Sequence, residues 1–188
     1  MAMAFDRIAL ESAFTDIGMR AMADHRLVEI AVYGGAALVL TLEGRVATQD
    51  LDAVVQNDAA WLRDVVAEVA HERGWREDWL NDGVKGFLSE RDAEPQAKRL
   101  FRSFPSERQP GLRVFVAQPA YLFAMKCLAM RIGGVDMTQD RSDITMLARV
   151  LNITDAEQAL ALVARYYPAR RISPRTQFGI EEIFGARL

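Results

Sequence analysis

Residues 32 to 55 read VYGGAALVLTLEGRVATQDLDAVV, and their pattern decides the fold. A run of β-branched and apolar residues, typical of a buried strand, ends at two glycines, Gly34 and Gly35. An apolar segment of helical propensity follows, and a second β-branched run carries two aspartates one position apart, Asp50 and Asp52. The stretch therefore predicts a strand, a tight turn into a short helix, and a second strand with two carboxylates on one face.

Helical and strand patterns continue on both sides of this stretch. In chain order we expect a helix over 5–24, a strand over 28–35, a helix over 36–43, a strand over 51–55, a helix over 58–73, one or two strands within 75–111, a strand over 112–117, and helices over 119–132, 139–151, from the capping-box sequence TDAE at 154–157 onward, and over 178–184. This order predicts an α+β protein, with a small mixed sheet backed by helices and a C-terminal helical bundle. We expect a core over residues 1–117 and a helical region over 118–188, packed together as one compact unit.

The composition is that of an ordinary globular protein. The chain has 188 residues, of which 51% are hydrophobic, so it can bury a sizeable core. Its formal net charge of -3 gives no bulk attraction to nucleic acid or to an acidic membrane. A single cysteine, Cys127, excludes an internal disulfide and a cysteine metal cluster, and its apolar surroundings indicate a buried core residue. No signal peptide or membrane span is evident, so we expect a cytoplasmic protein without a membrane partner.

The two glycines and the two aspartates suggest complementary halves of one site. Two carboxylates on one strand face repel each other unless a cation lies between them, and oxygen ligands favour Mg²⁺ or Mn²⁺. Gly34 and Gly35 lack a Cβ, so a phosphate can approach their backbone, and the helix that follows presents its N-terminal N–H groups. A phosphate cradle beside metal-binding Asp50 and Asp52 predicts phosphoryl or nucleotidyl transfer. Taken singly, a Gly-Gly turn or an Asp-x-Asp strand end is more often structural.

Two stretches carry a resemblance to a known family. Residues 34 to 55 resemble the signature of the DNA polymerase β-type nucleotidyltransferase superfamily, a glycine turn, a short helix and an hDxDh strand. Residues 120 to 153, AYLFAMKCLAMRIGGVDMTQDRSDITMLARVLNI, resemble a lysine-, arginine- and aspartate-containing segment of the AbiEii-type branch of bacterial nucleotidyltransferase-like proteins, some of which are toxins of toxin–antitoxin or phage-defence pairs. The resemblance implies a Mg²⁺- or Mn²⁺-dependent enzyme that transfers a nucleoside monophosphate from a nucleoside triphosphate to an RNA, tRNA or protein acceptor. It also implies an antitoxin-like protein as a binding partner.

The resemblance also assigns roles to residues around the glycine turn. It implies that Gly34 and Gly35 hold the triphosphate and that Asp50 and Asp52 bind the metal. In the polar segment that leads to the second strand, Arg45 and Thr48 are expected to contribute to nucleotide binding.

Further residues lie in the C-terminal stretch. Lys126 matches a lysine that is expected to reach the nucleotide phosphates, and Arg131 matches the arginine that follows it. Asp140 and Asp143 match the last motif, and their spacing of three puts them on one helix face. We expect these aspartates to hold Lys126 or Arg131 in place rather than to bind the metal. Without such a partner, Lys126 could instead extend to solvent at the edge of the core.

The sequence departs from the family pattern in three ways that bear on activity. The arginine or lysine that often follows the glycine turn is absent, unless Arg45 takes its place from the end of the helix. Gly35 stands where active members often carry serine. A third carboxylate is expected on a later strand, but the sequence GLRVFVA has Leu112 and Arg113 at the matching positions. The alternative function is therefore a catalytically degenerate member of the fold that acts as a protein- or nucleotide-binding module.

Two other clusters have both a functional and a structural interpretation. The sequence ARYYPARRISPR near the C-terminus interleaves arginines with tyrosines, which suits either an RNA-binding surface or a solvated helix end. The sequence WREDWLNDG contains Trp79, which could stack on a base, and Asp82, which could supply a further acid, but such a segment more often forms core aromatics beside a turn.

Overall fold

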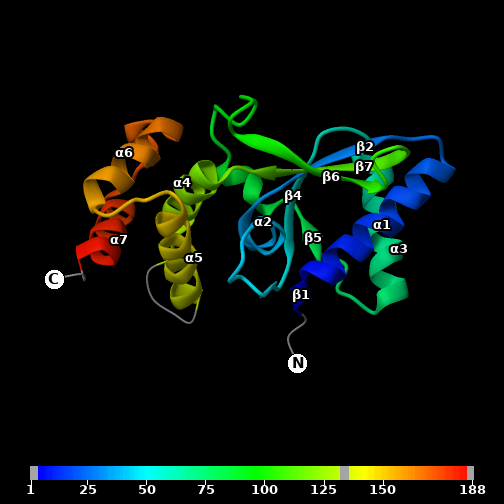
Figure 1. Ribbon diagram of the computed structural model, residues 1–188, viewed down its shortest axis with the longest axis horizontal. Helices are drawn as coiled ribbons and strands as arrows, with labels where there is room; N and C mark the ends of the chain where they lie inside the picture. The colour runs from blue at the N-terminus through cyan, green and yellow to red at the C-terminus, as the bar shows by residue number, and fades with distance from the viewer. Residues whose placement is uncertain (1–3, 132–135, 186–188) are drawn as a thin grey trace. The chain divides into compact units, whose positions relative to one another are not determined.

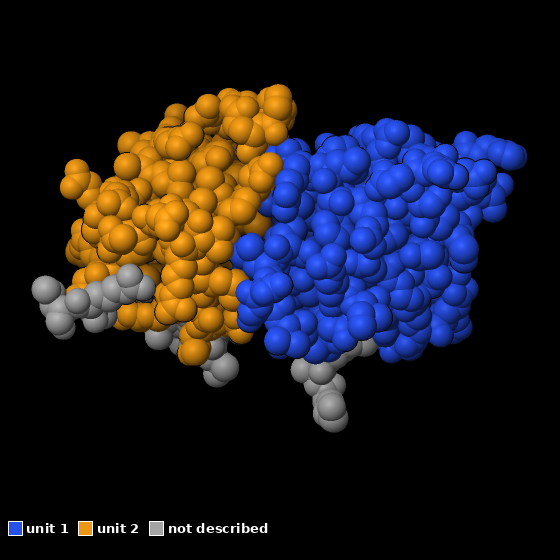
Figure 2. All heavy atoms as spheres, in the orientation of Figure 1, with its two compact units in different colours: residues 1–85, 98–117 blue, residues 86–97, 118–188 orange. Residues whose placement is uncertain are grey.

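The computed structural model describes residues 4–131 and 136–185, and for residues 136 and 137 it describes the backbone alone. The chain divides into two compact units, which are coloured separately in Figure 2. Unit 1 consists of Met1–Lys85 and Lys98–Ala117, and unit 2 of Gly86–Ala97 and Gln118–Leu188. The segment 86–97 thus groups with the C-terminal helices, whereas the sequence pattern placed it in the N-terminal core.

Unit 1 contains three helices and seven strands among its described residues (Figure 1). In chain order they are β1 (Phe5–Asp6), α1 (Arg7–Ala23), β2 (Val28–Val32), α2 (Gly34–Thr41), β3 (Ala47–Thr48), β4 (Leu51–Val55), α3 (Ala59–Arg73), β5 (Leu80–Asn81), β6 (Lys98–Pro105) and β7 (Pro110–Ala117), and the 3-10 helix η1 (Gly83–Phe87) begins after β5. The expected α+β class, with a small mixed sheet backed by helices and a C-terminal helical region, is confirmed.

Five strands form one mixed sheet in the order β5-β4-β2-β7-β6. The β2–β7 and β4–β5 pairs are parallel, and the β2–β4 and β6–β7 pairs are antiparallel. β2 lies at the centre of the sheet, and four of its five residues are buried, which explains why its sequence VEIAV is apolar except at the half-buried Glu29. The remaining strands, β1 and β3, pair with each other in a separate two-stranded sheet.

Helix α1 packs against β6, β7 and α3. Its inward face includes Leu10, Phe14 and Ile17, all fully buried. Each such side chain contributes about 1.5–3 kcal/mol to folding relative to an exposed position, so this layer is a major part of the core of unit 1.

Besides the segment 86–97, the described part of unit 2 contains α4 (Pro119–Ala129), α5 (Asp136–Val150), α6 (Ala156–Tyr166), η2 (Ala169–Arg171) and α7 (Pro174–Gly185). Helix α4 packs against α5, α6 and α7, and six of its eleven residues are buried. The expected helices are present, although α4 ends at Ala129 and the sequence pattern extended it to residue 132.

The start of α6 differs by one residue from the expected capping box. Asp155, not Thr154, is the N-cap, and its carboxylate accepts a hydrogen bond from the backbone N–H of Gln158 at 2.8 Å. Gln158 in turn accepts from the backbone N–H of Thr154 at 3.1 Å. The arrangement is therefore close to a capping box shifted by one position, except that Gln158 accepts from the N–H of Thr154, the residue before the N-cap, and not from that of Asp155.

Among residues 4–131 and 136–185, no helix combines the length and the apolar character that a membrane crossing requires.

Candidate functional site

The glycine turn joins the central strand of the sheet to a short buried helix. Tyr33 is the extended N-cap of α2, and its side chain makes no capping hydrogen bond. Gly34 is the first residue of α2 and has a left-handed backbone with φ of 58°. This conformation disfavours residues with a Cβ, so it explains the glycine at this position. The N-terminal N–H groups of a helix have no partner within the helix, which makes this turn suited to binding an anion.

Strand β4 brings Asp52 against this turn. The backbone N–H of Tyr33 donates to the carbonyl of Asp52 at 2.9 Å, next to the β2–β4 pair formed by Val32 and Ala53. A Cβ on Gly34 would overlap the Asp52 carboxylate oxygen Oδ2. The carboxylate of Asp52 is therefore in contact with the glycine turn, and a larger residue at position 34 would displace it.

The second glycine is packed against the polar segment that precedes β4. A Cβ on Gly35 would lie 2.6 Å from Thr48 Oγ1 and 3.2 Å from Arg45 Nη2. Thr48 is buried, and the Nε atom of Arg45 donates to the carbonyl of Ala47 at 2.9 Å. The structure thus brings together both glycines, Arg45, Thr48 and Asp52 within unit 1, which places a guanidinium beside the turn.

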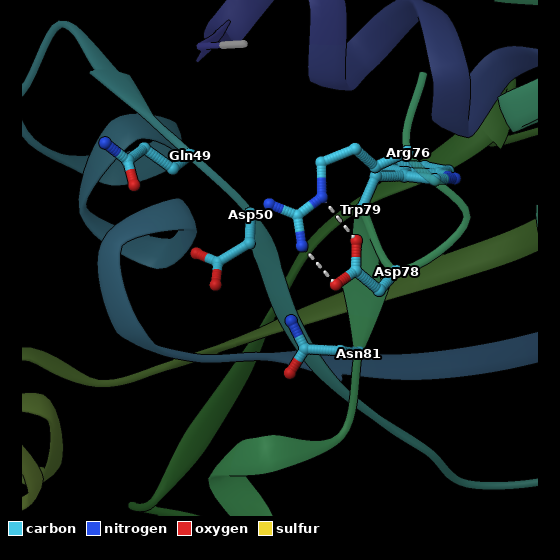
Figure 3. Close-up of a pocket in the computed structure, with 6 residues that line it drawn as sticks. All are labelled: Gln49, Asp50, Arg76, Asp78, Trp79 and Asn81. Atoms are coloured by element: carbon cyan, nitrogen blue, oxygen red, sulfur yellow. Dashed lines mark hydrogen bonds and ion pairs between the residues drawn. The ribbon is translucent and has the colours of Figure 1, made fainter. Parts of the chain in front are cut away.

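Asp50 occupies a different position from Asp52. It lies in a bend one residue before β4 and is exposed, whereas Asp52 lies within β4 and is half-buried. The expectation that both carboxylates belong to the same strand is therefore correct only for Asp52. Figure 3 shows Asp50 at a small pocket that is lined by Gln49, Asp50, Arg76, Asp78, Trp79 and Asn81.

The strand next to β4 does not come from the sequence GLRVFVA. That sequence forms β7, which pairs with β2 and β6, whereas the neighbour of β4 is the two-residue strand β5. In β5, Asn81 pairs in register with Asp52. The residue beside Asp52 on the neighbouring strand is therefore an amide and not a carboxylate. The next residue, Asp82, forms an ion pair with Lys85 at 2.6 Å, which lowers the pKa of its carboxyl group.

The donor set at this edge of the sheet suits a hard cation. Asp50 and Asp52 would supply carboxylate oxygens to it, and the adjacent turn would face the phosphates of a substrate. Mg²⁺ is characteristically held by one or two carboxylates together with substrate phosphates, so these residues fit it. Within residues 4–131 and 136–185, no group of three or more histidine, cysteine, aspartate or glutamate side chains is placed to hold a metal.

The C-terminal motif residues form a charge cluster within unit 2. Lys126 Nζ lies 2.9 Å from Asp143 Oδ2 and 3.5 Å from Asp140 Oδ1. The backbone N–H of Arg131 donates to Asp140 at 3.4 Å, and its Nε lies 3.6 Å from the same carboxylate. Asp143 is fully buried and accepts a further hydrogen bond from Gln139 at 2.9 Å. The aspartates of α5 therefore hold both the lysine and the arginine.

The chain matches no protein-family model and no curated protein. Among solved structures, it is similar to an antigenic nucleotidyltransferase-like protein from Paracoccidioides brasiliensis. The similarity covers 93% of this chain and 95% of that chain, with 13% sequence identity and a TM-score of 0.48.

The arginine- and tyrosine-rich C-terminal segment has structural contacts within unit 2. Arg171 donates to the carbonyls of Leu88 and Gly86, both at 2.7 Å, and stacks on the ring of Tyr167. Tyr167 donates its hydroxyl to the carbonyl of Phe87, also at 2.7 Å. These residues hold the segment 86–97 on the helices, which favours the structural interpretation of the cluster.

Two further residues belong to the core. Trp79 is buried, and its Nε1 donates to the carbonyl of Val66 at 3.2 Å, so its ring is not available to stack on a base. Cys127 is buried as expected, and burial raises the pKa of its thiol.

The pocket beside Asp50 was missed by the sequence reasoning. Arg76 and Gln49 were not singled out, and Asn81 was noted only as part of a polar, aromatic cluster. Their convergence depends on the pairing of β5 with β4, and a two-residue strand has no periodicity from which that pairing could be inferred.

Proposed function

We propose that unit 1 binds a nucleoside triphosphate with Mg²⁺ or Mn²⁺ and transfers a nucleoside monophosphate to an acceptor hydroxyl. The observation that carries the proposal is the contact between the Asp52 carboxylate and Gly34. It would put a metal-binding oxygen directly beside the backbone that would hold the phosphates.

Each residue of the site has a defined part in this reaction. The turn at Gly34 and Gly35 would bind the triphosphate, and Asp50 and Asp52 would hold the cation. A divalent cation at such a site neutralises phosphate charge and aligns the attacking group. The acceptor oxygen would form a bond to the α-phosphorus while the bond from this phosphorus to pyrophosphate breaks, and the acceptor proton would pass to solvent.

Arg45 is proposed as the cation that stabilises the charge of the phosphates. Its Nη2 lies close to Gly35, which supports a contact with phosphate bound at the turn. Thr48 would hold the turn in place, since its side chain is buried against Gly35. In unit 2, Lys126 and Arg131 stay predicted nucleotide-binding residues, with Asp140 and Asp143 as their supports. The RNA, tRNA or protein acceptor and the antitoxin-like partner also stay predictions.

One observation favours the alternative of a nucleotide-binding module without transferase activity. Asn81, which is not an acid, pairs with Asp52 on the neighbouring strand. A site with two carboxylates would hold one cation and could bind a nucleotide without activating an acceptor.

The proposal is tested by thermal unfolding of the protein with each nucleoside triphosphate, with and without Mg²⁺. A ligand at 100 times its dissociation constant adds about 2.7 kcal/mol of stability, which is readily measured. We expect a Mg²⁺-dependent increase that Asp52→Asn abolishes and Asp64→Asn, an exposed aspartate on α3, retains. The absence of an increase with every nucleotide would overturn the proposal. Binding without transfer of an α-phosphate label to any cellular RNA or protein would select the binding-module alternative.

A further inference from the structure

Three charged groups lie together at the pocket beside Asp50. The residues that line it include Arg76 and Asp78, and Figure 3 shows the Arg76 guanidinium between the two carboxylates. With two acids and one base in the pocket, the arginine can neutralise either Asp78 or Asp50. The carboxylate with which it pairs therefore decides whether Asp50 is available to a cation.

In the structure the arginine is paired with Asp78. The guanidinium donates to both carboxylate oxygens, through Nε at 2.8 Å and Nη2 at 2.5 Å. A pair that meets through two parallel hydrogen bonds has the most favourable geometry for these two groups. The contact raises the pKa of Arg76, to which the charge of Asp50 adds, and it lowers the pKa of Asp78. Among the described residues, no cationic side chain forms an ion pair with Asp50.

The backbone keeps this pair beside Asp50. The N–H of Trp79 donates to the carbonyl of Arg76 at 3.2 Å, which closes the turn that carries both charged residues. The carbonyl of Trp79 accepts from the N–H of Leu51, the residue after Asp50, at 2.7 Å. Trp79 is itself anchored, because its side chain is buried. The turn thus holds Arg76 near Asp50, and the direction of the guanidinium depends on Asp78.

Without its partner, the Arg76 guanidinium would turn toward the other carboxylate of the pocket. A guanidinium and a metal cation are both positive, so they compete for the oxygens of Asp50. The side chains of Arg76 and Asp78 are largely exposed, so water and salt weaken this competition. It would therefore lower the affinity for a cation without preventing its binding.

We propose that Asp78 is a positioning residue that holds Arg76 on itself and thereby keeps Asp50 available to the cation. The inference rests on the proposed metal–nucleotide site and adds a residue that controls the strength of cation binding there. Asp78 contacts neither the cation nor the nucleotide in this role. Arg76 is the competing charge, and its effect appears when Asp78 is removed.

The test is a titration of the full-length protein with the Mn²⁺ complex of a non-hydrolysable nucleoside triphosphate analogue, in which water-proton relaxation reports bound Mn²⁺. Asp78→Asn should weaken binding by about three- to tenfold, because Arg76 then competes for Asp50. Arg76→Gln alone should change binding by less than about twofold. The double variant Arg76→Gln/Asp78→Asn should bind like the unaltered protein, because the competing charge is gone.

Asp82→Asn is the matched control, since it removes the same charge from an exposed ion pair further along the chain. It leaves Lys85 without the carboxylate that lies 2.6 Å away, and it should change Mn²⁺ binding by less than about twofold. Equal affinities of Asp78→Asn and Asp82→Asn would overturn the inference. A double variant as weak as Asp78→Asn would also overturn it, because the loss would then come from the missing carboxylate and not from Arg76.

Salt provides a second readout of the competition between charges. The difference between Asp78→Asn and the unaltered protein should shrink as NaCl is raised from about 0.05 to about 0.5 M, whereas the effect of a disrupted turn would persist. A difference that does not depend on salt would contradict the role of Arg76.

The variant Asp52→Asn separates this inference from the proposed function. If Asp52→Asn abolishes the binding of Mn²⁺ and Asp78→Asn leaves it unchanged, only the role of Asp78 is wrong. The absence of Mn²⁺ binding by the unaltered protein would overturn both.

Discussion

The carboxylate of Asp52 lies against Gly34 so closely that a single methyl group on the glycine would overlap its Oδ2 atom. This contact joins the end of the central strand to the aspartate strand beside it. Because Gly34 also has a left-handed backbone, its replacement affects both the conformation of the turn and the position of the carboxylate.

The first prediction separates these two effects. Gly34→Ala should lower the free energy of unfolding by more than the about 1–2 kcal/mol that a left-handed alanine costs, because the methyl group also displaces Asp52. Gly74→Ala is the matched control, since Gly74 has φ of 65° and a Cβ there would meet nothing within 4 Å. Urea unfolding measures the loss of stability in both variants. Equal destabilisation by the two substitutions would contradict the importance of the contact with Asp52.

The second prediction concerns Gly35, at the position where the superfamily that the sequence resembles often has serine. Gly35→Ala should destabilise the protein by about 1–3 kcal/mol through overpacking against Thr48, and a serine should fit no better. In a double-mutant cycle, Thr48→Ala should restore a large part of the loss, because it removes the Oγ1 atom that lies 2.6 Å from the added Cβ. Gly86→Ala, where the space is open, should be nearly neutral. Strict additivity of the two changes would show that the residues do not interact.

Long, periodic segments of this chain could be predicted from the sequence, and short ones could not. The helices over 7–23 and 59–73 and the strand over 51–55 follow from repeated spacings of apolar residues. In contrast, β5 has two residues, and its place beside β4 depends on a contact between segments about thirty positions apart. The strand beside β4 could therefore not be identified from the sequence.

In the candidate site, too, the residues of one continuous segment could be predicted, whereas contacts between distant segments could not. Gly34, Gly35 and Asp52 were expected at the site from their local spacing, and Arg45 and Thr48 from the resemblance. All five belong to one strand–helix–strand unit, and the structure brings them together. The pocket beside Asp50 needed the register of two strands, which leaves no pattern in the sequence.

The third prediction tests the buried ion pair of unit 2. Lys126→Met leaves the fully buried Asp143 without its lysine, and loss of one partner of a buried pair typically costs about 3–5 kcal/mol. The double variant Lys126→Met/Asp143→Leu should recover most of this loss. Arg170→Met, which removes an exposed ion pair with Glu90, should cost less than about 1 kcal/mol. If Lys126→Met were as mild as Arg170→Met in chemical denaturation, the lysine would not be held as described.

The fourth prediction concerns alkaline pH. Burial raises the pKa of the Tyr167 hydroxyl, which donates to the carbonyl of Phe87, above its ordinary value of about 10. Because the folded pKa is higher than the unfolded one, the stabilising contribution is complete below pH of about 10 and is lost as the pH rises above it. Tyr167→Phe should lower stability near neutral pH by about 1 kcal/mol and make the loss above pH 10 less steep. Parallel stability curves for both proteins, measured by urea unfolding from neutral to alkaline pH, would refute this role of Tyr167.

The most direct measurement for the central claim is paramagnetic broadening of the ¹⁵N-labelled protein by Mn²⁺ together with a non-hydrolysable nucleoside triphosphate analogue. If Asp50, Asp52 and the glycine turn form one metal–nucleotide site, the backbone amides of Gly34, Gly35 and Asp52 broaden first. This broadening should disappear in Asp52→Asn and persist in Asp64→Asn. Uniform broadening over the surface, or broadening of the turn that survives Asp52→Asn, would contradict the claim.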